Sequence, residues 1–553
     1  MVRDPEWGVW VYRGRRLPGA LAQHGARPHS WERLVEGELN GEPGAVVTRG
    51  REAVPPLRPY QVPRVAEMRA AHAAGAPGFM LTYPTGSGKT ATGISALTSL
   101  PGMGAVLVVT KLSVVPAWRA AIDVFARGGQ RWVVVNPEGL VRLLAHPRVD
   151  LSRLPAEQAA RLAADGGRSR VAWDGVIVDE SQVLADAESI RSRLLRRITH
   201  PAGGRRPWWL RMSATGFSSP VETAYLADLI AHVAGVDEPS DLARGPYKEW
   251  LRELGFALNT NAAGRWYHQF NPGDVSMVRE LLYSSGVGAT ATPQELGLPA
   301  QARELLPVEL TPKELEHYRL SWNEFRRVRG MDADQDPDAV HEPGAGDGRQ
   351  AAALRQVQRA SLLKAPYVAR IVADLVAEGH QVAVPAWYLE SVRALAAAIA
   401  RELGARGLCD RVAEITGEEP GLREPRRKAF QLGACQVVVV NAVEGINLHA
   451  GEKDVGGPGV HATSTPRVTV FADVLTGGKK LLQGEGRTQR DGLRARAVYV
   501  VVLDTAETEW LAQAFRAAAG TQALAQAPKD AADLTSLADE LGALRASPAA
   551  GAR

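Results

Sequence analysis

Short runs of consecutive apolar residues alternate along this chain with longer stretches in which apolar residues recur at helical spacing. The runs are rich in Val, Ile and Leu and end at polar residues, as in parallel strands that are buried on both faces. The predicted strands are Gly78–Leu81, Ala105–Lys111, Val133–Val135, Val176–Val178, Gln381–Pro385, Gln436–Asn441 and Ala497–Leu503. Helices are predicted between them, including 91–100 and 367–378. Because the alternation occurs in both halves of the chain, it predicts an α/β protein with two parallel-sheet lobes.

The segment Pro84-Thr85-Gly86-Ser87-Gly88-Lys89-Thr90 joins a predicted strand to a predicted helix. A glycine-rich turn in this position is typical of a phosphate-binding loop, whose backbone N–H groups surround nucleotide phosphates. Lys89 is expected to reach the outer phosphates of ATP, and Thr90 to offer its hydroxyl to Mg²⁺. Tyr83 stands where the common pattern has its first glycine, so the eight-residue form is not met. The alternative is a glycine- and serine-rich loop that happens to contain a lysine.

Two adjacent carboxylates, Asp179 and Glu180, follow the apolar run Val176–Val178. At the end of a buried strand, downstream of a phosphate loop, such a pair serves phosphoryl transfer, which depends on positioning and charge neutralisation. We expect Asp179 to hold Mg²⁺ through its water shell and Glu180 to orient and deprotonate the attacking water. The alternative is a purely structural role for the pair.

Composition limits the class of protein without naming it. The chain has 553 residues, too many for one hydrophobic core, so at least two domains are expected. The net charge of +4 is weak over this length, so any contact with DNA or RNA must come from local patches. Cys409 and Cys435 have no partner at metal-ligand spacing and fit a reduced, cytoplasmic protein. The compactness of the chain suits an enzyme of a bacterial or phage-infected cell. No signal peptide or apolar run of membrane-spanning length is present, and no membrane partner is expected.

Further motifs surround these two sites in a fixed order. They are Leu57-Arg58-Pro59-Tyr60-Gln61, Pro116-Ala117-Trp118, Ser213-Ala214-Thr215, Gly445-Ile446-Asn447-Leu448 and Gln483-Gly484-Glu485-Gly486-Arg487-Thr488-Gln489-Arg490. The series resembles the superfamily-two helicases, and the Swi/Snf-related translocases in particular, over residues 57 to 490. This resemblance implies two RecA-like lobes with an ATP cleft between them. Gln182 closes the Asp-Glu-x-x box where the family often has His or Asp, so coupling to the nucleic-acid site can differ in detail.

The resemblance implies roles for residues of the first lobe. Gln61 is expected to recognise the adenine of ATP, although the same residues also read as a plain helix start. Ser213 and Thr215 are expected to link the ATP state to movement of the lobes. Thr110 and Lys111 are expected to hold the nucleic-acid backbone; the alternative is a strand end with a solvated lysine.

In the second lobe, the resemblance implies that Gly445 and Asn447 contact nucleic acid and the cleft, although a strand-to-turn junction explains the same residues. Gln483, Arg487 and Arg490 lie three or four residues apart, so on a helix they would share one face. That spacing can direct two guanidinium groups at the γ-phosphate as arginine fingers. The alternative is a surface helix with ion pairs.

The expected domains are an N-terminal extension at 1–50, lobe 1 at 51–235, a connector at 236–304, lobe 2 at 305–520 and a C-terminal tail at 521–553. The extension is expected to be β-rich. Surface insertions are expected near 331–350 and 451–466, and Pro366 is placed at a helix start. The arginine run at 191–206 either follows a phosphate backbone or forms a solvated helix face.

These observations favour an ATP-dependent DNA helicase or translocase that uses ATP and Mg²⁺ and contacts DNA mainly through phosphates. The DNA is duplex or single-stranded, and protein partners in replication, repair or recombination are expected. The alternatives are an RNA helicase, or a DNA-binding ATPase that acts as a switch or scaffold without translocation.

Overall fold

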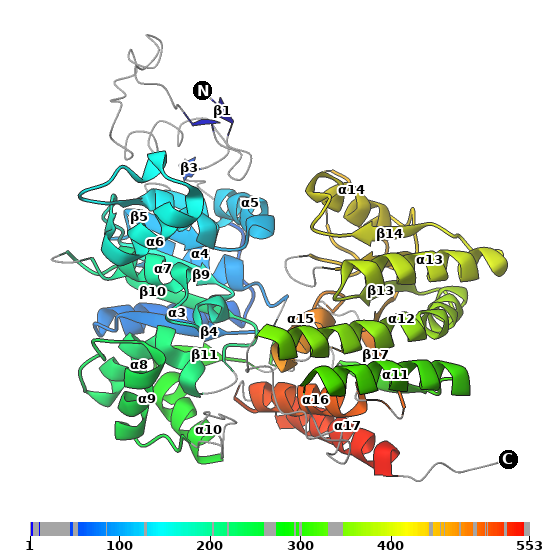
Figure 1. Cartoon of the computed structure of the whole chain (residues 1–553). Coiled ribbons are helices and arrows are strands. Elements are labelled where there is room, and N and C mark those ends of the chain that lie inside the picture. Colours follow the sequence, from blue (N-terminus) through cyan, green and yellow to red (C-terminus); the bar gives the residue numbers. More distant parts are fainter. Residues whose placement is uncertain are drawn as a thin grey trace. The chain divides into compact units, whose positions relative to one another are not determined.

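A computed structural model places the elements of the chain as drawn in Figure 1. The chain divides into two compact units, which are residues 1–84 with 88–291 and residues 292–553 with the short segment 85–87. Each unit has a parallel sheet and a core of its own. The residues that the structure describes are 2–3, 10–11, 45–47, 54–84, 86–126, 130–201, 204–217, 220–258, 272–291, 295–297, 301–329, 347–441, 446–453, 455–457, 459–474, 477–489, 495–503, 505, 507–524 and 528–546.

The first unit is built on a sheet with the strand order β11-β4-β10-β9-β5-β6-β3. All neighbouring strands are parallel except β3, which pairs antiparallel with β6 at one edge. The strands are β3 (Ala45–Val47), β4 (Gly78–Thr82), β5 (Ala105–Val109), β6 (Arg131–Val135), β9 (Gly175–Asp179), β10 (Trp208–Ser213) and β11 (Gly288–Thr290). Two small antiparallel pairs also occur, β1 (Val2–Arg3) with β2 (Trp10–Val11) and β7 (Leu144–Ala145) with β8 (Arg168–Ser169). The strands predicted from apolar runs in this half are confirmed.

Helices connect the parallel strands of the first sheet. The α-helices are α3 (Gln61–Ala73), α4 (Lys89–Ser99), α5 (Val115–Phe125), α6 (Ala156–Gly166), α7 (Ile190–Thr199), α8 (Ala227–Ala234), α9 (Arg244–Glu253) and α10 (Pro272–Val278). Shorter helical turns are η1 (Leu112–Val114), η2 (Pro137–Leu143), η3 (Leu151–Arg153), η4 (Ser181–Leu184), η5 (Pro220–Leu226) and the π-helix η6 (Arg279–Ser284). Helix α4 packs closely on β10 at Gly93. A Cβ atom added at this glycine would lie only 3.0 Å from Met212 Sδ, so a larger residue would not fit without a shift.

The second unit contains a sheet with the order β12-β17-β16-β13-β15-β14, in which all pairs are parallel. Its strands are β12 (Ala302–Val308), β13 (Gln381–Pro385), β14 (Val412–Ile415), β15 (Val437–Val440), β16 (Arg467–Phe471) and β17 (Ala495–Val502). Its helices are α11 (Pro312–Arg329), α12 (Asp347–Ala377), α13 (Leu389–Ala405), α14 (Pro420–Gln431), α15 (Gly478–Glu485), α16 (Glu507–Leu524) and α17 (Pro528–Ala546). The predicted fold class, α/β with two parallel-sheet lobes, is confirmed.

The residues of β17 show how this sheet is covered on both faces. Val498 and Val500 point into a core shared with α12 and α13, whereas Tyr499 and Val501 face α16 and α17. This alternation follows from the two-residue period of a strand, and it explains why the strand is apolar throughout. None of the helices in the described ranges is long and apolar enough to cross a membrane.

Three expected boundaries differ from the structure. The expected connector at 236–304 supplies β11 to the first sheet, and the first unit extends to Ala291 instead of ending at 235. The expected tail at 521–553 supplies α17, whose Leu534 and Leu541 are buried in the second core. Pro366 lies inside α12 and does not start a helix, because the helix begins at Asp347. Each difference arises because a short or weakly patterned segment is held by long-range packing that local sequence does not reveal.

Candidate nucleotide-binding and hydrolysis site

The phosphate loop has the backbone shape that its glycines predict. Gly86 and Gly88 adopt φ angles of 87° and 77°, in the left-handed region that glycine enters at no steric cost. Gly88 is the N-cap of α4, so Lys89 and Thr90 are the first two residues of that helix. The N–H groups at this end of the helix have no partner within the helix and suit a phosphate group. Ser87 lies in the same turn, and Thr85 lies outside the described residues.

Gln61, which was expected to recognise adenine, is bound to this loop. Its Nε2 donates to the carbonyl oxygen of Gly88 and to Thr92 Oγ1, both at 3.0 Å, and its Oε1 accepts from the N–H of Arg58 at 2.8 Å. The N–H of Arg58 fixes which end of the amide is oxygen, because a flipped amide would place two donors together. Both amide hydrogens are thereby used, so Gln61 supports the end of the phosphate loop in this conformation.

Lys89 folds back onto the loop that precedes it. Its Nζ donates to the carbonyl oxygens of Tyr83 and Pro84, at 2.8 and 3.2 Å. Burial raises the pKa of Asp179, and the charge of the same ammonium group opposes that rise. The lysine and the acidic pair, far apart in the sequence, are therefore near one another in the first unit.

Asp179 ends β9 and is held by three donors. Trp118 Nε1 and Thr110 Oγ1 donate to its Oδ2, at 2.8 and 3.2 Å, and the N–H of Glu180 donates to its Oδ1 at 3.1 Å. Burial is the main cause that raises the pKa of Asp179, and the neighbouring charge of Glu180 raises it further, while these side-chain donors oppose the rise. Neutral donors that fix a carboxylate in this way are typical of metal-binding acids.

Glu180 has a strained backbone. Its φ of 54° and ψ of 50° lie in the left-handed region, and no other described residue except glycine has a positive φ. Such a conformation costs of order 1–3 kcal/mol for a residue with a side chain and is concentrated at functional sites. The left-handed residue turns the chain directly after β9, at the point where η4 begins.

Gln182 connects Glu180 to the Ser213-Ala214-Thr215 motif. Its Nε2 donates to Glu180 Oε2 at 2.7 Å, and its Oε1 accepts from Ser213 Oγ at 2.6 Å. Ser213 Oγ in turn accepts from the N–H groups of Thr215 and Gly216, at 3.0 and 2.7 Å. A continuous chain of hydrogen bonds therefore runs from the expected catalytic base to the motif expected to report the ATP state.

Thr110 has a different neighbour from the one expected. It is 2% exposed and donates to Asp179, so its hydroxyl faces the acidic pair instead of an external phosphate. Lys111 is the N-cap of the turn η1 and is only partly exposed. Its expected contact with nucleic acid stays a prediction.

The arginine run at 191–206 is largely bound within the first unit. Arg193 pairs with Asp165, and Arg197 Nε donates to the carbonyl oxygen of Ala164 at 3.0 Å. Arg206 pairs with Glu238 at 2.7 Å. These contacts favour a helix face with internal ion pairs over a phosphate-binding surface.

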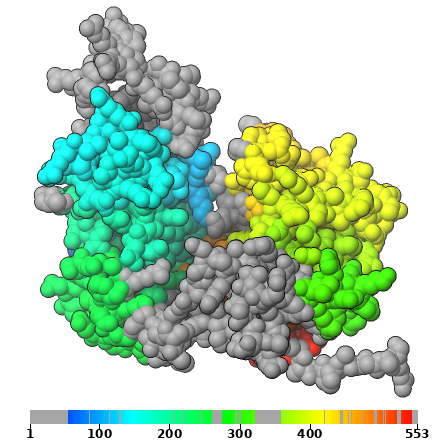
Figure 2. All heavy atoms as spheres, in the orientation of Figure 1, coloured from blue at the N-terminus to red at the C-terminus, as the bar shows by residue number. Residues whose placement is uncertain are grey.

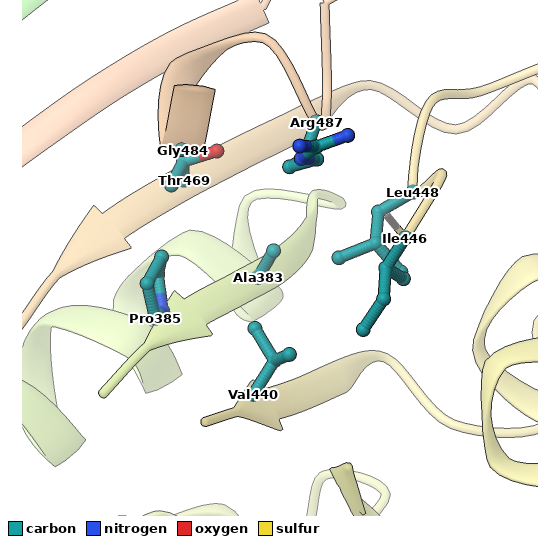
Figure 3. Close-up of a pocket in the computed structure, with 8 residues that line it drawn as sticks. All are labelled: Ala383, Pro385, Val440, Ile446, Leu448, Thr469, Gly484 and Arg487. Atoms are coloured by element: carbon teal, nitrogen blue, oxygen red, sulfur yellow. The ribbon is translucent and has the colours of Figure 1, made fainter. Parts of the chain in front are cut away.

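In the second unit, Arg487 and the segment after β15 come together. The N–H of Leu448 donates to the carbonyl oxygen of Arg487 at 3.0 Å. The side chains of both residues, with Ile446, line a small cavity of about 10 Å³ over β13 and β15 (Figure 3). Asn447 stands in the sequence between Ile446 and Leu448, which line this cavity. Gly445 and Arg490 lie outside the described residues.

Among the described residues, Gln483 and Arg487 do not share the expected helical face. Helix α15 ends at Glu485, so Gln483 is helical and buried, whereas Arg487 lies in the turn that follows. The shared face was inferred from spacing alone, and the glycine-rich sequence ends the helix before Arg487. The backbone contact with Leu448, and not helical spacing, positions Arg487 in the second unit.

Sequence reasoning missed three groups around the first site. Trp118 and Gln182 bind the acidic pair, and Tyr283 Oη makes a 2.7 Å hydrogen bond with Thr82 Oγ1 at the end of β4. Only the position of Gln182 in the Asp-Glu-x-x box was a signal for its role. The other two contacts join segments that no local pattern relates.

Comparisons with known proteins give little beyond the fold. No protein-family model matches the sequence, and no curated protein matches it. Among solved structures, the chain is similar to the Sulfolobus solfataricus SWI2/SNF2 ATPase core in complex with dsDNA, with 13% sequence identity over 90% of this chain and 98% of that chain and a TM-score of 0.32. Because the TM-score is low, this similarity does not assign a function to the chain.

Proposed function

We propose that this chain is a DNA-stimulated ATP hydrolase that couples hydrolysis to translocation along DNA. The observation that carries the proposal is the hydrogen-bond chain from Glu180 through Gln182 to Ser213, next to an acidic pair and a phosphate loop. A nucleotide-binding protein without hydrolysis needs the loop but has no use for a strained, positioned Glu180. The motifs that resemble Swi/Snf-related translocases support DNA as the partner.

The residues present fit a magnesium–nucleotide complex. The turn of Gly86 to Gly88 leaves N–H groups at the start of α4 for phosphate oxygens, and Lys89 is close enough to Asp179 to affect its pKa. Thr90 and Asp179 would hold Mg²⁺, directly and through water. When bound, the ion neutralises charge that develops on the phosphates during transfer.

Glu180 would act on the attacking water. Its Oε2 accepts from Gln182, which fixes the side chain in one direction, and the carboxylate held in this way would take the proton of the water. Lys89 would leave the carbonyl oxygens of Tyr83 and Pro84 when it binds the outer phosphates, because a charged acceptor replaces two neutral ones.

The second unit would supply further groups: Arg487 and Arg490 are proposed as arginine fingers and Asn447 as a contact to DNA phosphates. Lys111 of the first unit is proposed as another phosphate contact. Phosphate contacts hold DNA without reading its sequence, as a motor requires. Cycles of nucleotide binding and release would then move the bound DNA.

Displacement of a triplex-forming strand from duplex DNA tests translocation directly. We expect ATP-dependent displacement by the wild-type chain and none by Glu180→Gln, which preserves the size of the side chain but cannot take the proton. ATP hydrolysis without displacement would refute the motor and favour the switch, and displacement by Glu180→Gln would refute the assigned role of Glu180.

A further inference from the structure

Three consecutive carbonyl groups in the second unit are each bound by a side chain from elsewhere. They belong to Asn447, Leu448 and His449, which form neither helix nor strand. Arg427 Nη1 donates to the first at 3.3 Å, Arg467 Nε to the second at 3.2 Å and Gln431 Nε2 to the third at 3.0 Å. Backbone carbonyls outside regular structure need such partners when they are away from water.

Arg467 is unusual because it is a buried charge without an acidic partner among the described residues. It is 2% exposed, and its guanidinium binds only neutral oxygens: Gln381 Oε1, Gln431 Oε1 at 3.3 Å, Thr463 Oγ1 at 3.1 Å and the Leu448 carbonyl. Burial lowers its pKa to about 10, so it remains charged at neutral pH.

The location of Arg467 explains how one side chain reaches so far. It begins β16 directly opposite Gln381 of β13, and its guanidinium lies 4.9 Å from the ring centre of Phe430 in α14. Helix α14, coloured yellow in Figures 1 and 2, also carries Gln431 and Arg427. The loop that leaves β15 is therefore bound from a strand and from a helix.

A purely structural core would not need this arrangement. An apolar side chain at 467 would avoid the cost of burying a charge, which neutral acceptors offset only when the guanidinium nitrogens are hydrogen-bonded. Each of the three guanidinium nitrogens has a partner, and four of the five N–H groups are accounted for by hydrogen bonds. These hydrogen bonds hold the backbone of Asn447 to His449 in place. The N–H of Leu448 in this segment also donates to the Arg487 carbonyl oxygen.

We propose that Arg467 and Gln431 are positioning residues, which hold this segment in the shape that contacts nucleic acid. The proposal rests on the proposed function for its nucleic-acid part, whereas the restraint on the backbone stands without it. Neither side chain touches DNA or nucleotide; each acts through the carbonyl that it binds.

Two measurements on Arg467→Met test the proposal. We expect faster hydrogen exchange at the amides of Leu448, Gly451 and Ala462, measured without DNA or nucleotide. We also expect the DNA concentration for half-maximal ATPase stimulation to rise about tenfold, as for loss of one hydrogen bond to a charged group, with kcat at saturating DNA changed less than about threefold. This split between half-saturation and kcat is one that general destabilisation does not produce.

The matched control is Arg426→Met. Arg426 lies on α14 with Gln431 and carries the same charge as Arg467, but it binds Glu419 and the Glu414 carbonyl, not the segment. Gln431→Met removes the bond to His449 and should shift both readouts in the same direction if Arg467→Met does not fold.

The outcomes separate the two proposals. Unchanged exchange in Arg467→Met, or an equal change in Arg426→Met, would overturn the positioning role. Faster exchange with unchanged DNA half-saturation would overturn its link to nucleic acid. A wild-type chain that no nucleic acid stimulates would instead overturn the proposed function, while the exchange data still decide whether Arg467 restrains the segment.

Discussion

Removal of the Trp118 indole donor should weaken ATP hydrolysis by disturbing Asp179. The indole N–H is 2.8 Å from Asp179 Oδ2, and Trp118 is fully buried, so Trp118→Phe deletes a short hydrogen bond to a charged acceptor. Such bonds contribute about 1.5–3 kcal/mol. If about 2 kcal/mol of the energy of this hydrogen bond serves to orient the carboxylate for the metal, kcat/KM falls roughly 30-fold in Trp118→Phe.

Thr110→Val provides the second perturbation at the same oxygen. Its bond is longer, 3.2 Å, so a smaller loss of about fivefold is expected. Both variants should need more Mg²⁺ for half-maximal hydrolysis, because the carboxylate is less well fixed for the ion. If Thr110 instead holds the nucleic-acid backbone, Thr110→Val would leave hydrolysis without DNA unchanged and alter only the DNA half-saturation.

Trp132→Phe is the control for this experiment. Trp132 is also fully buried in the first unit, but its indole nitrogen has no hydrogen-bond partner among the described residues. Steady-state ATPase against Mg²⁺ concentration should separate Trp118→Phe from both wild type and this control. A Trp118→Phe rate within twofold of wild type, at an unchanged Mg²⁺ requirement, would refute the role of the indole.

Three further predictions follow from other contacts. Gln182→Met removes the donor to the catalytic carboxylate, so kcat should fall about tenfold with KM for ATP little changed, in steady-state assays. Lys364 and Glu507 form a fully buried pair at 2.8 Å, so Lys364→Met should destabilise the second unit by about 3–5 kcal/mol in urea unfolding, and pairing it with Glu507→Leu should restore most of the loss. Burial alone would raise the pKa of Glu238, but His200 and nearby arginines hold it at about 2, against an ordinary 4.5. Its stabilisation is complete above pH 4.5 and lost as the pH falls toward 2, so Glu238→Gln should cost of order 1 kcal/mol at pH 6 and almost nothing at pH 2, by urea unfolding at each pH.

Local sequence was sufficient for the parts of the fold that each element specifies alone. The strands β4, β5, β9 and β15 are uninterrupted apolar runs, and a strand buried on both faces has few other sequence patterns. The phosphate loop could also be predicted from the sequence, because a turn with left-handed backbone strongly favours glycine at those positions. The acidic pair was found because it ends a strand.

Contacts between distant segments could not be read in the same way. Trp118 meets Asp179 across 61 residues, and Thr82 meets Tyr283 across 201. No fixed spacing in the sequence predicts either contact, since both depend on the order of strands in the sheet. The short strand β11 was missed for a related reason: pairing with β4 holds a weakly patterned segment that local propensity leaves open.

The most direct test of the central claim is steady-state ATP hydrolysis with no nucleic acid, single-stranded DNA, duplex DNA and RNA, with Glu180→Gln in parallel. We expect strong stimulation by duplex DNA that Glu180→Gln abolishes. Stimulation by single strands alone would favour a strand-separating helicase, and stimulation by RNA alone an RNA helicase. Hydrolysis that no nucleic acid changes, or that persists in Glu180→Gln, would contradict the account.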